Sequence, residues 1–266
     1  MHLETILDKT RQTVEQRKRL ASLKALEKQA AAHQPRGFVA SLAQRSRDGY
    51  AIIAELKKAS PSKGLIRADF EPGFLAQSLE RGGAAALSVL TDESFFQGSL
   101  RNLEIASSVT TIPCLRKDFI IDEFQILEAR ASAADAVLLI AAALKFEELD
   151  RLTKFAHSVG LEVLCEVHTA KELDGVGGFG CDAYGVNNRD LVSFEVRLET
   201  SEKLGSSLPE GALRVAESGL NTPEDLRRLK RVGFDAFLIG ESLMRKAAPG
   251  SALAALLAAA YASPVR

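Results

Sequence analysis

Two oppositely charged residues stand on one face at the end of an apolar segment. Residues 51–57 begin as an apolar strand, and the side chains of a strand alternate between its faces, so Glu55 and Lys57 project to the same side as Ile53. A carboxylate and an ammonium held together in this way can act as a base and an acid in proton transfer. The same pair could instead be an internal salt bridge that ends a core strand, because structural ion pairs also perturb charged sites.

Polar side chains also follow six of the seven later apolar segments, each time at the C-terminal end. In chain order they are Thr91, Asp92 and Glu93; Arg116, Lys117 and Asp118; Glu166 and His168; Asn187, Asn188, Arg189 and Asp190; Glu217 and Ser218; and Glu241 and Ser242. A solvated rim is one interpretation. Core packing avoids lysine and glutamate at inward-facing positions, however, so the pattern favours a catalytic mouth at this end.

The elements that must position these groups are eight strand-like segments separated by segments with helical spacing. The expected strands are residues 51–57, 85–90, 112–116, 136–141, 161–167, 183–187, 213–217 and 236–240. Between them, Thr222 and Pro223 have the residue types of a helix start. Alternating strands and helices in this number predict a (β/α)8 TIM barrel, whose chemistry lies at the C-terminal strand ends. An open doubly wound sheet is the alternative, but its glycine fingerprint is absent.

A helical extension precedes the first strand. Residues 3–33 have partial apolar helical stripes, Pro35, Arg36 and Gly37 end this region, and residues 38–42 could form another helical turn. No low-complexity linker interrupts the chain. The sequence therefore predicts one domain over residues 1–266, of which 1–48 form the extension.

Composition limits the partners. The chain has 266 residues, 46% of them hydrophobic, and a formal net charge of −1, which argues against nucleic-acid binding. The first thirty residues are charged throughout, unlike a signal peptide, and the longest apolar runs are too short to span a bilayer. Cys114, Cys165 and Cys181 form no CxxC pair. We therefore expect a reduced, cytoplasmic protein without membrane partners, and a monomer.

Small residues at the last two strand ends point to an anion. Ser218 and Gly219 follow strand seven, and Gly240 and Glu241 follow strand eight, where barrels often bind phosphate with the help of a short extra helix. Residues 241–246 could form that helix, and Lys57 would add a cation. A plain turn is the alternative.

A metal site is not expected. Glu166 and His168 lie two residues apart, but the other histidines do not cluster with carboxylates at ligand spacing. Nothing in the sequence calls for a cofactor either.

At this point the residues resemble a known family, the indole-3-glycerol phosphate synthases of tryptophan biosynthesis. The resemblance covers every expected strand end in order: IIAELKKASPS at 52–62, LTDESFFQGS at 90–99, PCLRKDFII at 113–121, ADAVLLIAAAL at 134–144, EVLCEVH at 162–168, YGVNNRDL at 184–191, VAESGL at 215–220 and FLIGESLMR at 237–245. The N-terminal segment departs from the pattern, because Thr10 and Thr13 stand where many members carry Lys and Glu.

The resemblance implies a carbon–carbon lyase that closes an indole ring. Its substrate would be 1-(2-carboxyphenylamino)-1-deoxy-D-ribulose 5-phosphate, which loses carbon dioxide and water. Lys117 is like the family's general acid for ring closure, and Glu166 looks like the group that orients it. Glu55 and Lys57 look like the base and second acid of the dehydration, although which lysine serves which step stays open.

The resemblance also implies how the substrate would be held. Asn187 and Glu217 are similar to residues that fix the ribulose hydroxyls, and Arg189 suits the substrate carboxylate by its fork geometry. The remaining substrate contacts would come from Ser60, Phe96, Phe119, Leu138 and Leu191, and those to phosphate from Lys57, Ser218, Gly219, Gly240 and Glu241. Arg189 could instead pair with Asp190 or Glu217, and the two phenylalanines could be ordinary loop-packing residues.

Other phosphate-binding barrels remain as alternatives. A Schiff-base aldolase would use Lys57 or Lys117 as its nucleophile, which borohydride trapping would reveal. A phosphoribosyl isomerase usually needs a Cys or Asp on strand one, where Glu55 and Lys57 stand here. A catalytically silent phosphate-binding protein would tolerate the loss of Lys117 or Glu166, yet both are present.

Overall fold

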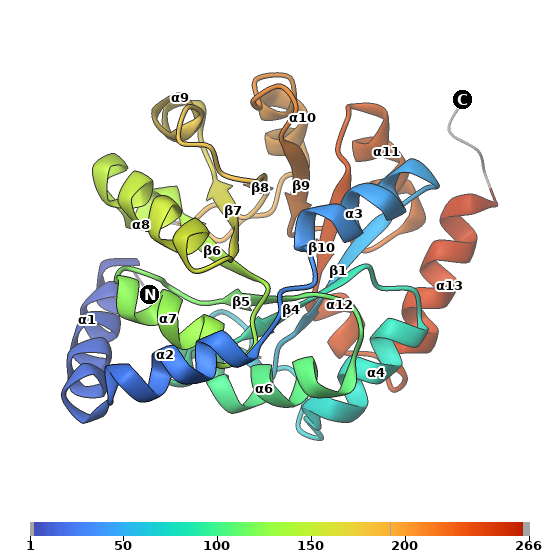
Figure 1. The fold of residues 1–266 in the computed structure, drawn as a ribbon. Helices are drawn as coiled ribbons and strands as arrows, with labels where there is room; N and C mark the ends of the chain where they lie inside the picture. The colour runs from blue at the N-terminus through green and yellow to red at the C-terminus, as the bar shows by residue number, and fades with distance from the viewer. Residues whose placement is uncertain (1–2, 192, 263–266) are drawn as a thin grey trace.

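Eight parallel strands close into a barrel in the computed structural model, which describes residues 3–191 and 193–262 (Figure 1). Around the barrel the strands follow the order β1-β10-β9-β8-β7-β6-β5-β4. Their bounds are β1 Ala51–Leu56, β4 Ala86–Leu90, β5 Cys114–Lys117, β6 Ala136–Ile140, β7 Glu162–Val167, β8 Ala183–Asn187, β9 Leu213–Glu217 and β10 Ala236–Ile239. The predicted TIM barrel is confirmed, and each predicted strand agrees within two residues at either end.

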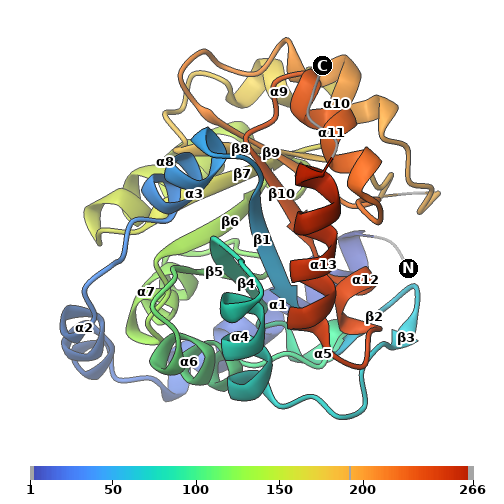
Figure 2. The same cartoon turned by 90° about the vertical axis from the view of Figure 1, so that its right-hand side faces the viewer.

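Helices cover the outside of the barrel, as Figure 2 shows from a second side. The helices on the outside are α4 Pro72–Arg81, α6 Leu100–Val109, α7 Glu123–Ala131, α8 Phe146–Ser158, α9 Ala170–Val176, α10 Glu199–Gly205, α11 Pro223–Arg231 and α13 Pro249–Tyr261. Two short helices, α5 Glu93–Phe96 and α12 Glu241–Met244, lie at the C-terminal ends of the strands, and a 3-10 turn follows β6 at Ala141–Ala143. The helix start predicted at Thr222 is confirmed, because its Oγ1 accepts a hydrogen bond from the Asp225 N–H at 3.2 Å. None of the described helices combines the length and apolar character needed to cross a bilayer.

The loop after β1 contains a small hairpin that the sequence did not predict. Strands β2 Ala59–Ser60 and β3 Gly64–Leu65 pair antiparallel, and Gly64 has a φ of 63°, which glycine adopts without strain. The two-residue strands are too short for an alternating pattern, so periodicity carries no signal here.

The barrel interior changes character along its axis. Residues at the first inward positions are small or apolar, for example Ala51, Ile53, Ala236 and Leu238, and they form one buried cluster. The last inward position of β1 is Glu55, and charged residues hold the corresponding places on β5 and β7. A packed apolar floor therefore supports a charged layer at the C-terminal end.

The N-terminal extension consists of three helices rather than one long one. A break at Ala21 and Ser22 divides the predicted helix 3–33 into α1 Leu3–Leu20 and α2 Leu23–Ala32, and Ser22 caps α2. The short turn predicted at residues 38–42 is the longer helix α3 Phe38–Arg47. Phe38 and Leu42 are fully buried in the interior cluster, so α3 closes the N-terminal end of the barrel.

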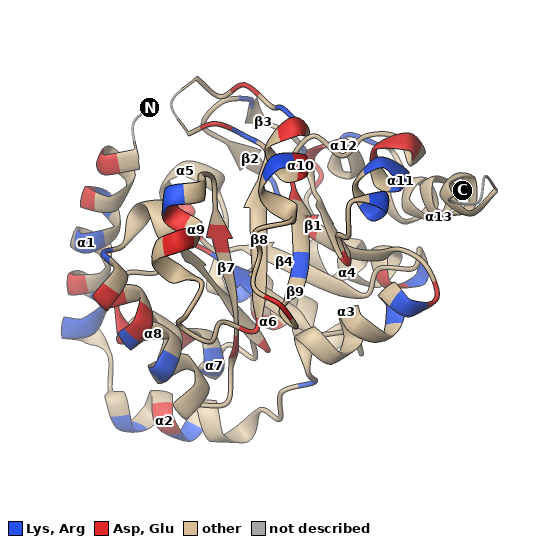
Figure 3. Ribbon diagram, turned by 90° about the horizontal axis from the view of Figure 1, so that it is seen from above, with Lys and Arg blue, Asp and Glu red and all other residues tan. Residues whose placement is uncertain are grey.

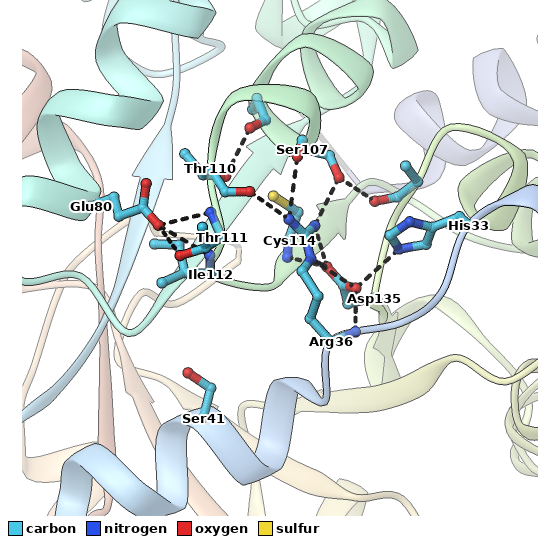
Figure 4. A network of polar contacts seen from close by, with 12 residues as sticks. His33, Arg36, Ser41, Glu80, Ser107, Thr110, Thr111, Ile112, Cys114 and Asp135 are labelled. Atoms are coloured by element: carbon cyan, nitrogen blue, oxygen red, sulfur yellow. Dashed lines mark hydrogen bonds and ion pairs between the residues drawn. The ribbon is translucent and has the colours of Figure 1, made fainter.

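A buried ionic cluster fastens the α2–α3 connection to the barrel (Figure 4). The Asp135 carboxylate is inaccessible to solvent; it accepts hydrogen bonds from the Arg36 side chain and backbone, from the Cys114 N–H at 2.6 Å, and faces His33 Nε2 at 3.0 Å. Arg36 also donates to the Thr110 carbonyl at 3.0 Å. Burial lowers the pKa of His33 despite its contact with Asp135. Each oxygen of the buried carboxylate thus accepts at least two hydrogen bonds, which makes the cluster sensitive to losing a partner.

We expect Asp135→Asn to lower the free energy of unfolding by about 3–5 kcal/mol, because it leaves the Arg36 guanidinium buried without its counter-charge. Urea unfolding followed by circular dichroism measures this. Asp150→Asn is the matched control: it breaks the surface pair with Lys154 and should cost about 0.5 kcal/mol or less. Equal unfolding midpoints for the two variants would show that the buried cluster does not stabilise the fold.

Candidate active site

A cavity of about 900 Å³ opens at the C-terminal ends of the strands. Every candidate site residue from the sequence lines it: Glu55, Lys57, Ser60, Phe96, Lys117, Phe119, Leu138, Glu166, Asn187, Arg189, Leu191, Glu217, Ser218, Gly219, Gly240 and Glu241. Figure 3 shows acidic and basic segments on the strands inside the ring of helices as well as on the outer helices. Parallel topology explains the convergence, because all the strand ends meet at one rim.

Glu55 and Lys57 form an ion pair at the end of β1. Their side chains are 5% and 18% exposed, so the pair is buried but reaches the cavity. A Cβ atom at Gly240 would overlap the Glu55 carboxylate, so glycine directly after the neighbouring strand β10 leaves space for it. The backbone thus makes room for a charged group that a packed core would exclude.

Lys117 lies at the centre of a group of carboxylates. Its Nζ is 3.1 Å from Glu166 Oε2 and 3.8 Å from Glu217 Oε2. Burial would by itself lower the pKa of Lys117, but Glu166, Glu217 and Glu55 together raise that pKa well above its ordinary value. Lys117 is therefore a protonated ammonium in the free protein.

The two carboxylates beside Lys117 have opposite pKa shifts. Burial opposes the charge of Glu166, but Lys117, His168 and the Asn187 amide lower its pKa to about 2. Burial and the nearby Glu166 charge raise the pKa of Glu217 well above its ordinary value. The two shifts run in opposite directions, so Glu166 is the stronger acid of the two and ionises before Glu217.

Asn187 is held in one orientation. Its Oδ1 accepts hydrogen bonds from the Arg189 N–H at 3.0 Å and from Ser218 Oγ at 2.8 Å, which directs its amide nitrogen toward Glu166. Ser218 has a φ of 66°, a conformation that costs a non-glycine residue of the order of 1 kcal/mol or more. Strained backbone of this kind gathers at functional sites, and here it adjoins Gly219, with a φ of 81°.

The apolar part of the cavity lies over β4, β5 and β6. Phe96 and Phe119 pack with ring centroids 6.2 Å apart and an interplanar angle of 41°, and Leu138 adds an aliphatic wall. Asp92 caps α5 by accepting hydrogen bonds from the Phe95 and Phe96 N–H groups. The cap fixes Phe96 at the rim, where a planar ring could stack.

Small residues and cations border the opposite side. Helix α12 begins at Glu241 directly after Gly240, so the short extra helix predicted at residues 241–246 is present over its first turn. Arg245 and Lys246 line the cavity too, with Arg245 Nε donating to Glu241 Oε1 at 2.9 Å. The N–H groups in the first turn of a helix lack partners within that helix, so the start of α12 and these two cations could bind an anion.

Sequence reasoning missed the residues that come from outside the strand ends. Leu3 and Ile6 of α1 line the cavity, as do Phe194, Val196 and Leu198 of the loop after β8. The apolar stripe on the first helix was visible, but nothing in the sequence says which part of the barrel that helix covers. Arg189 Nη1 donates to the Phe194 carbonyl at 3.3 Å, which ties this loop to the rim.

No group of three or more His, Cys, Asp or Glu side chains that could hold a metal ion occurs among residues 3–191 and 193–262. The expectation of a metal-free, cofactor-free site stays a prediction.

Comparisons with known proteins agree with this geometry. Residues 3–256 match the family model described as indole-3-glycerol phosphate synthase. A protein of that name from Koribacter versatilis is 55% identical over 255 residues, covering 96% of this chain and 98% of the relative. Another, from Chromobacterium violaceum, is 50% identical over 222 residues, covering 83% and 84%, and a third, from Campylobacter hominis, is 46% identical over 248 residues, covering 92% and 95%.

Solved structures with much lower sequence identity share the fold. A 3-hexulose-6-phosphate synthase from Salmonella typhimurium has a TM-score of 0.63 at 11% identity, covering 80% of this chain and 99% of that one. A thiamine phosphate pyrophosphorylase from Pyrococcus furiosus has a TM-score of 0.60 at 16% identity, covering 82% and 98%. These two show the barrel alone, whereas the family model and the curated relatives extend over nearly the whole chain. The chain therefore belongs to the indole-3-glycerol phosphate synthase family.

Proposed function

We propose that the protein closes the indole ring of 1-(2-carboxyphenylamino)-1-deoxy-D-ribulose 5-phosphate with loss of carbon dioxide and water, a step of tryptophan biosynthesis. The observation that carries the proposal is the meeting of two lysine–glutamate pairs, Glu55–Lys57 and Lys117–Glu166, at one cavity of a chain that matches the family from residue 3 to 256. We further propose a cytoplasmic monomer.

Lys117 is the proposed acid for ring closure. The aromatic carbon must attack the sugar carbonyl as that carbonyl oxygen takes up a proton, and a protonated ammonium in the cavity can donate it. Glu166 Oε2, 3.1 Å from Lys117 Nζ, directs the ammonium and stabilises the positive charge that develops on the attacking ring. Decarboxylation then restores the aromatic ring.

Glu55 and Lys57 are the proposed base and acid for the dehydration. Loss of the hydroxyl needs a proton on the departing oxygen, and formation of the double bond needs a base to remove a proton. The pair lies at the end of β1, on the same side of the barrel as the small residues of β9 and β10. General acids and bases of this kind contribute about 100- to 10,000-fold each.

The other lining residues would hold the three parts of the substrate. We propose that Arg189 binds the carboxylate, that Asn187 and Glu217 bind the ribulose hydroxyls, and that Ser60 contacts the substrate at the rim. The anthranilate ring would lie among the apolar residues Phe96, Phe119, Leu138 and Leu191. Phosphate would meet Lys57 and the backbone of Ser218, Gly219, Gly240 and Glu241.

A Schiff-base aldolase is less compatible with the charges in the cavity. Its lysine must lose its proton to attack a carbonyl, and enzymes achieve this by lowering the lysine pKa. Here three carboxylates raise the pKa of Lys117, which suits a proton donor rather than a nucleophile.

The test of the proposed function is to incubate the purified protein with the anthranilate–ribulose phosphate substrate and follow indole fluorescence. We expect a continuous rise that depends on enzyme concentration, without any adduct after borohydride treatment. A trapped adduct, or substrate consumed without an indole product, would instead support another reaction of a phosphate-binding barrel.

We expect inorganic phosphate to compete with the substrate by binding at residues 218–219 and 240–241. Inhibition kinetics and a crystal soaked in sulfate measure this. Phosphate density elsewhere, with none at these two strand ends, would contradict the assignment.

A further inference from the structure

His168 lies behind the active site rather than in it. It follows β7, its side chain is 8% exposed, and it is absent from the cavity lining, although it stands only two residues after Glu166. A buried histidine needs partners for its ring nitrogens, so its surroundings show what it does.

The imidazole is held between two carboxylates. Nε2 faces Glu166 Oε1 at 3.4 Å, and Nδ1 faces Glu172 Oε2, on α9, at 3.5 Å. Glu172 is itself fixed, because it accepts hydrogen bonds from the His168 N–H at 2.7 Å and from the Thr169 hydroxyl at 3.0 Å. Neither ring nitrogen makes a hydrogen bond within the described residues, so these two ion-pair contacts are what holds the imidazole.

These contacts share the Glu166 carboxylate between two cations. Its Oε2 meets Lys117 Nζ at 3.1 Å, while its Oε1 faces the imidazole. A carboxylate with both oxygens engaged is held against rotation, and small displacements of a catalytic group reduce rates strongly. The Glu172–His168–Glu166–Lys117 series therefore links the first turn of α9 to the proposed acid.

We propose that the His168 imidazolium is a positioning residue, which holds the Glu166 carboxylate in the orientation that directs Lys117. This inference rests on the proposed function, because Glu166 and Lys117 have their roles only there.

The charges around His168 favour the imidazolium. Burial by itself would lower the pKa of His168, but Glu172 on α9 and Glu166 on β7 outweigh burial and the opposing charge of Lys117 on β5, so the pKa lies above its ordinary value of 6.5. Because the pKa is raised, the charge is complete at acidic pH and is lost as pH rises through the raised value. The positioning of Glu166 by His168 should therefore weaken as pH rises through the same value.

The test compares kcat of wild type and His168→Gln across pH. Glutamine keeps the polarity but removes the charge, so we expect a loss of about tenfold at acidic pH. The loss should shrink to about twofold or less once the pH has passed the raised pKa of His168, because the wild-type imidazole is then neutral as well. The same comparison is then made with Glu172→Gln present in both proteins. The pH at which their two kcat values converge should then be lower, because one of the carboxylates that raise the pKa of His168 is gone. His157→Gln is the matched control, because it breaks a surface His–Asp pair with Asp182 and should leave the profile unchanged.

A loss that is the same at every pH would assign His168 a structural role and overturn the proposal. A titration of the histidine side chains by NMR supplies a reading that needs no substrate, with the His168→Gln spectrum identifying the signal. We expect a midpoint above 6.5 that falls in Glu172→Gln. A midpoint at or below 6.5 refutes the inference even if indole is formed, whereas the expected midpoint without indole formation refutes the proposed function instead.

Discussion

Lys117→Met is expected to lower kcat by about 1000-fold or more, because it removes the proposed proton donor for ring closure. Methionine keeps the length and volume of the side chain, so the change removes the charge without opening a cavity. Glu166 and Glu217 are then left without the ammonium, but the pKa of Glu217 is already raised by burial and by Glu166, so the two can share a proton. We therefore expect the fold to persist.

Single-turnover kinetics measure the rate of the chemical step, and circular dichroism shows whether the variant is folded. Phosphate affinity should change little, because the proposed phosphate contacts come from Lys57 and the ends of β9 and β10 rather than from Lys117. Lys58→Met serves as the control: Lys58 is next to the site in sequence, but it does not line the cavity. Activity within tenfold of wild type would remove Lys117 from the mechanism.

Glu55→Gln and Lys57→Met are expected to cost activity far more than stability. If the pair were only structural, breaking it would leave a buried charge and lower stability by about 3–5 kcal/mol. Residues held for chemistry are poor for packing, so their removal often leaves stability unchanged or higher. We expect rate losses of about 100-fold or more in each variant, with thermal midpoints unchanged or raised.

Thermal unfolding and kcat, measured on the same preparations, separate the two interpretations. Lys58→Met again provides the reference for an alteration at the end of β1 outside the cavity. If both variants unfold at much lower temperature while their folded fraction has normal kcat, the pair is a structural salt bridge. The proposed catalytic roles of Glu55 and Lys57 are then wrong.

The barrel and its strand-end residues could be predicted because both follow from local patterns. Parallel strands place their C-terminal ends on one rim, so the polar residues at the ends of the apolar segments had to converge. Residues as distant in sequence as Glu55 and Glu217 therefore share one cavity. The boundaries were accessible as well, since the strands predicted at residues 51–57 and 213–217 agree with β1 and β9 within one residue.

What could not be predicted depends on tertiary contacts that leave no periodic signal. Leu3 and Ile6 reach the cavity only because α1 packs beside the mouth, and an apolar stripe does not say which surface it covers. Arg36 marked the end of a helical region, but its partner Asp135 is 99 residues away. The proposed role of His168 could not be predicted for the same reason. Its spacing from Glu166 suggested a test for a metal site, whereas its Nδ1 contacts Glu172 on the next helix.

Substrate labelled with ¹³C in the aromatic carboxylate tests whether the protein couples ring closure to decarboxylation through Lys117. Carbon dioxide is followed by mass spectrometry and the indole product by fluorescence in the same reaction. We expect labelled carbon dioxide and indole product to appear in equal amounts, and neither to appear with Lys117→Met at the same enzyme concentration. Consumption of substrate with the label retained, as in cleavage or isomerisation of the sugar phosphate, would contradict it.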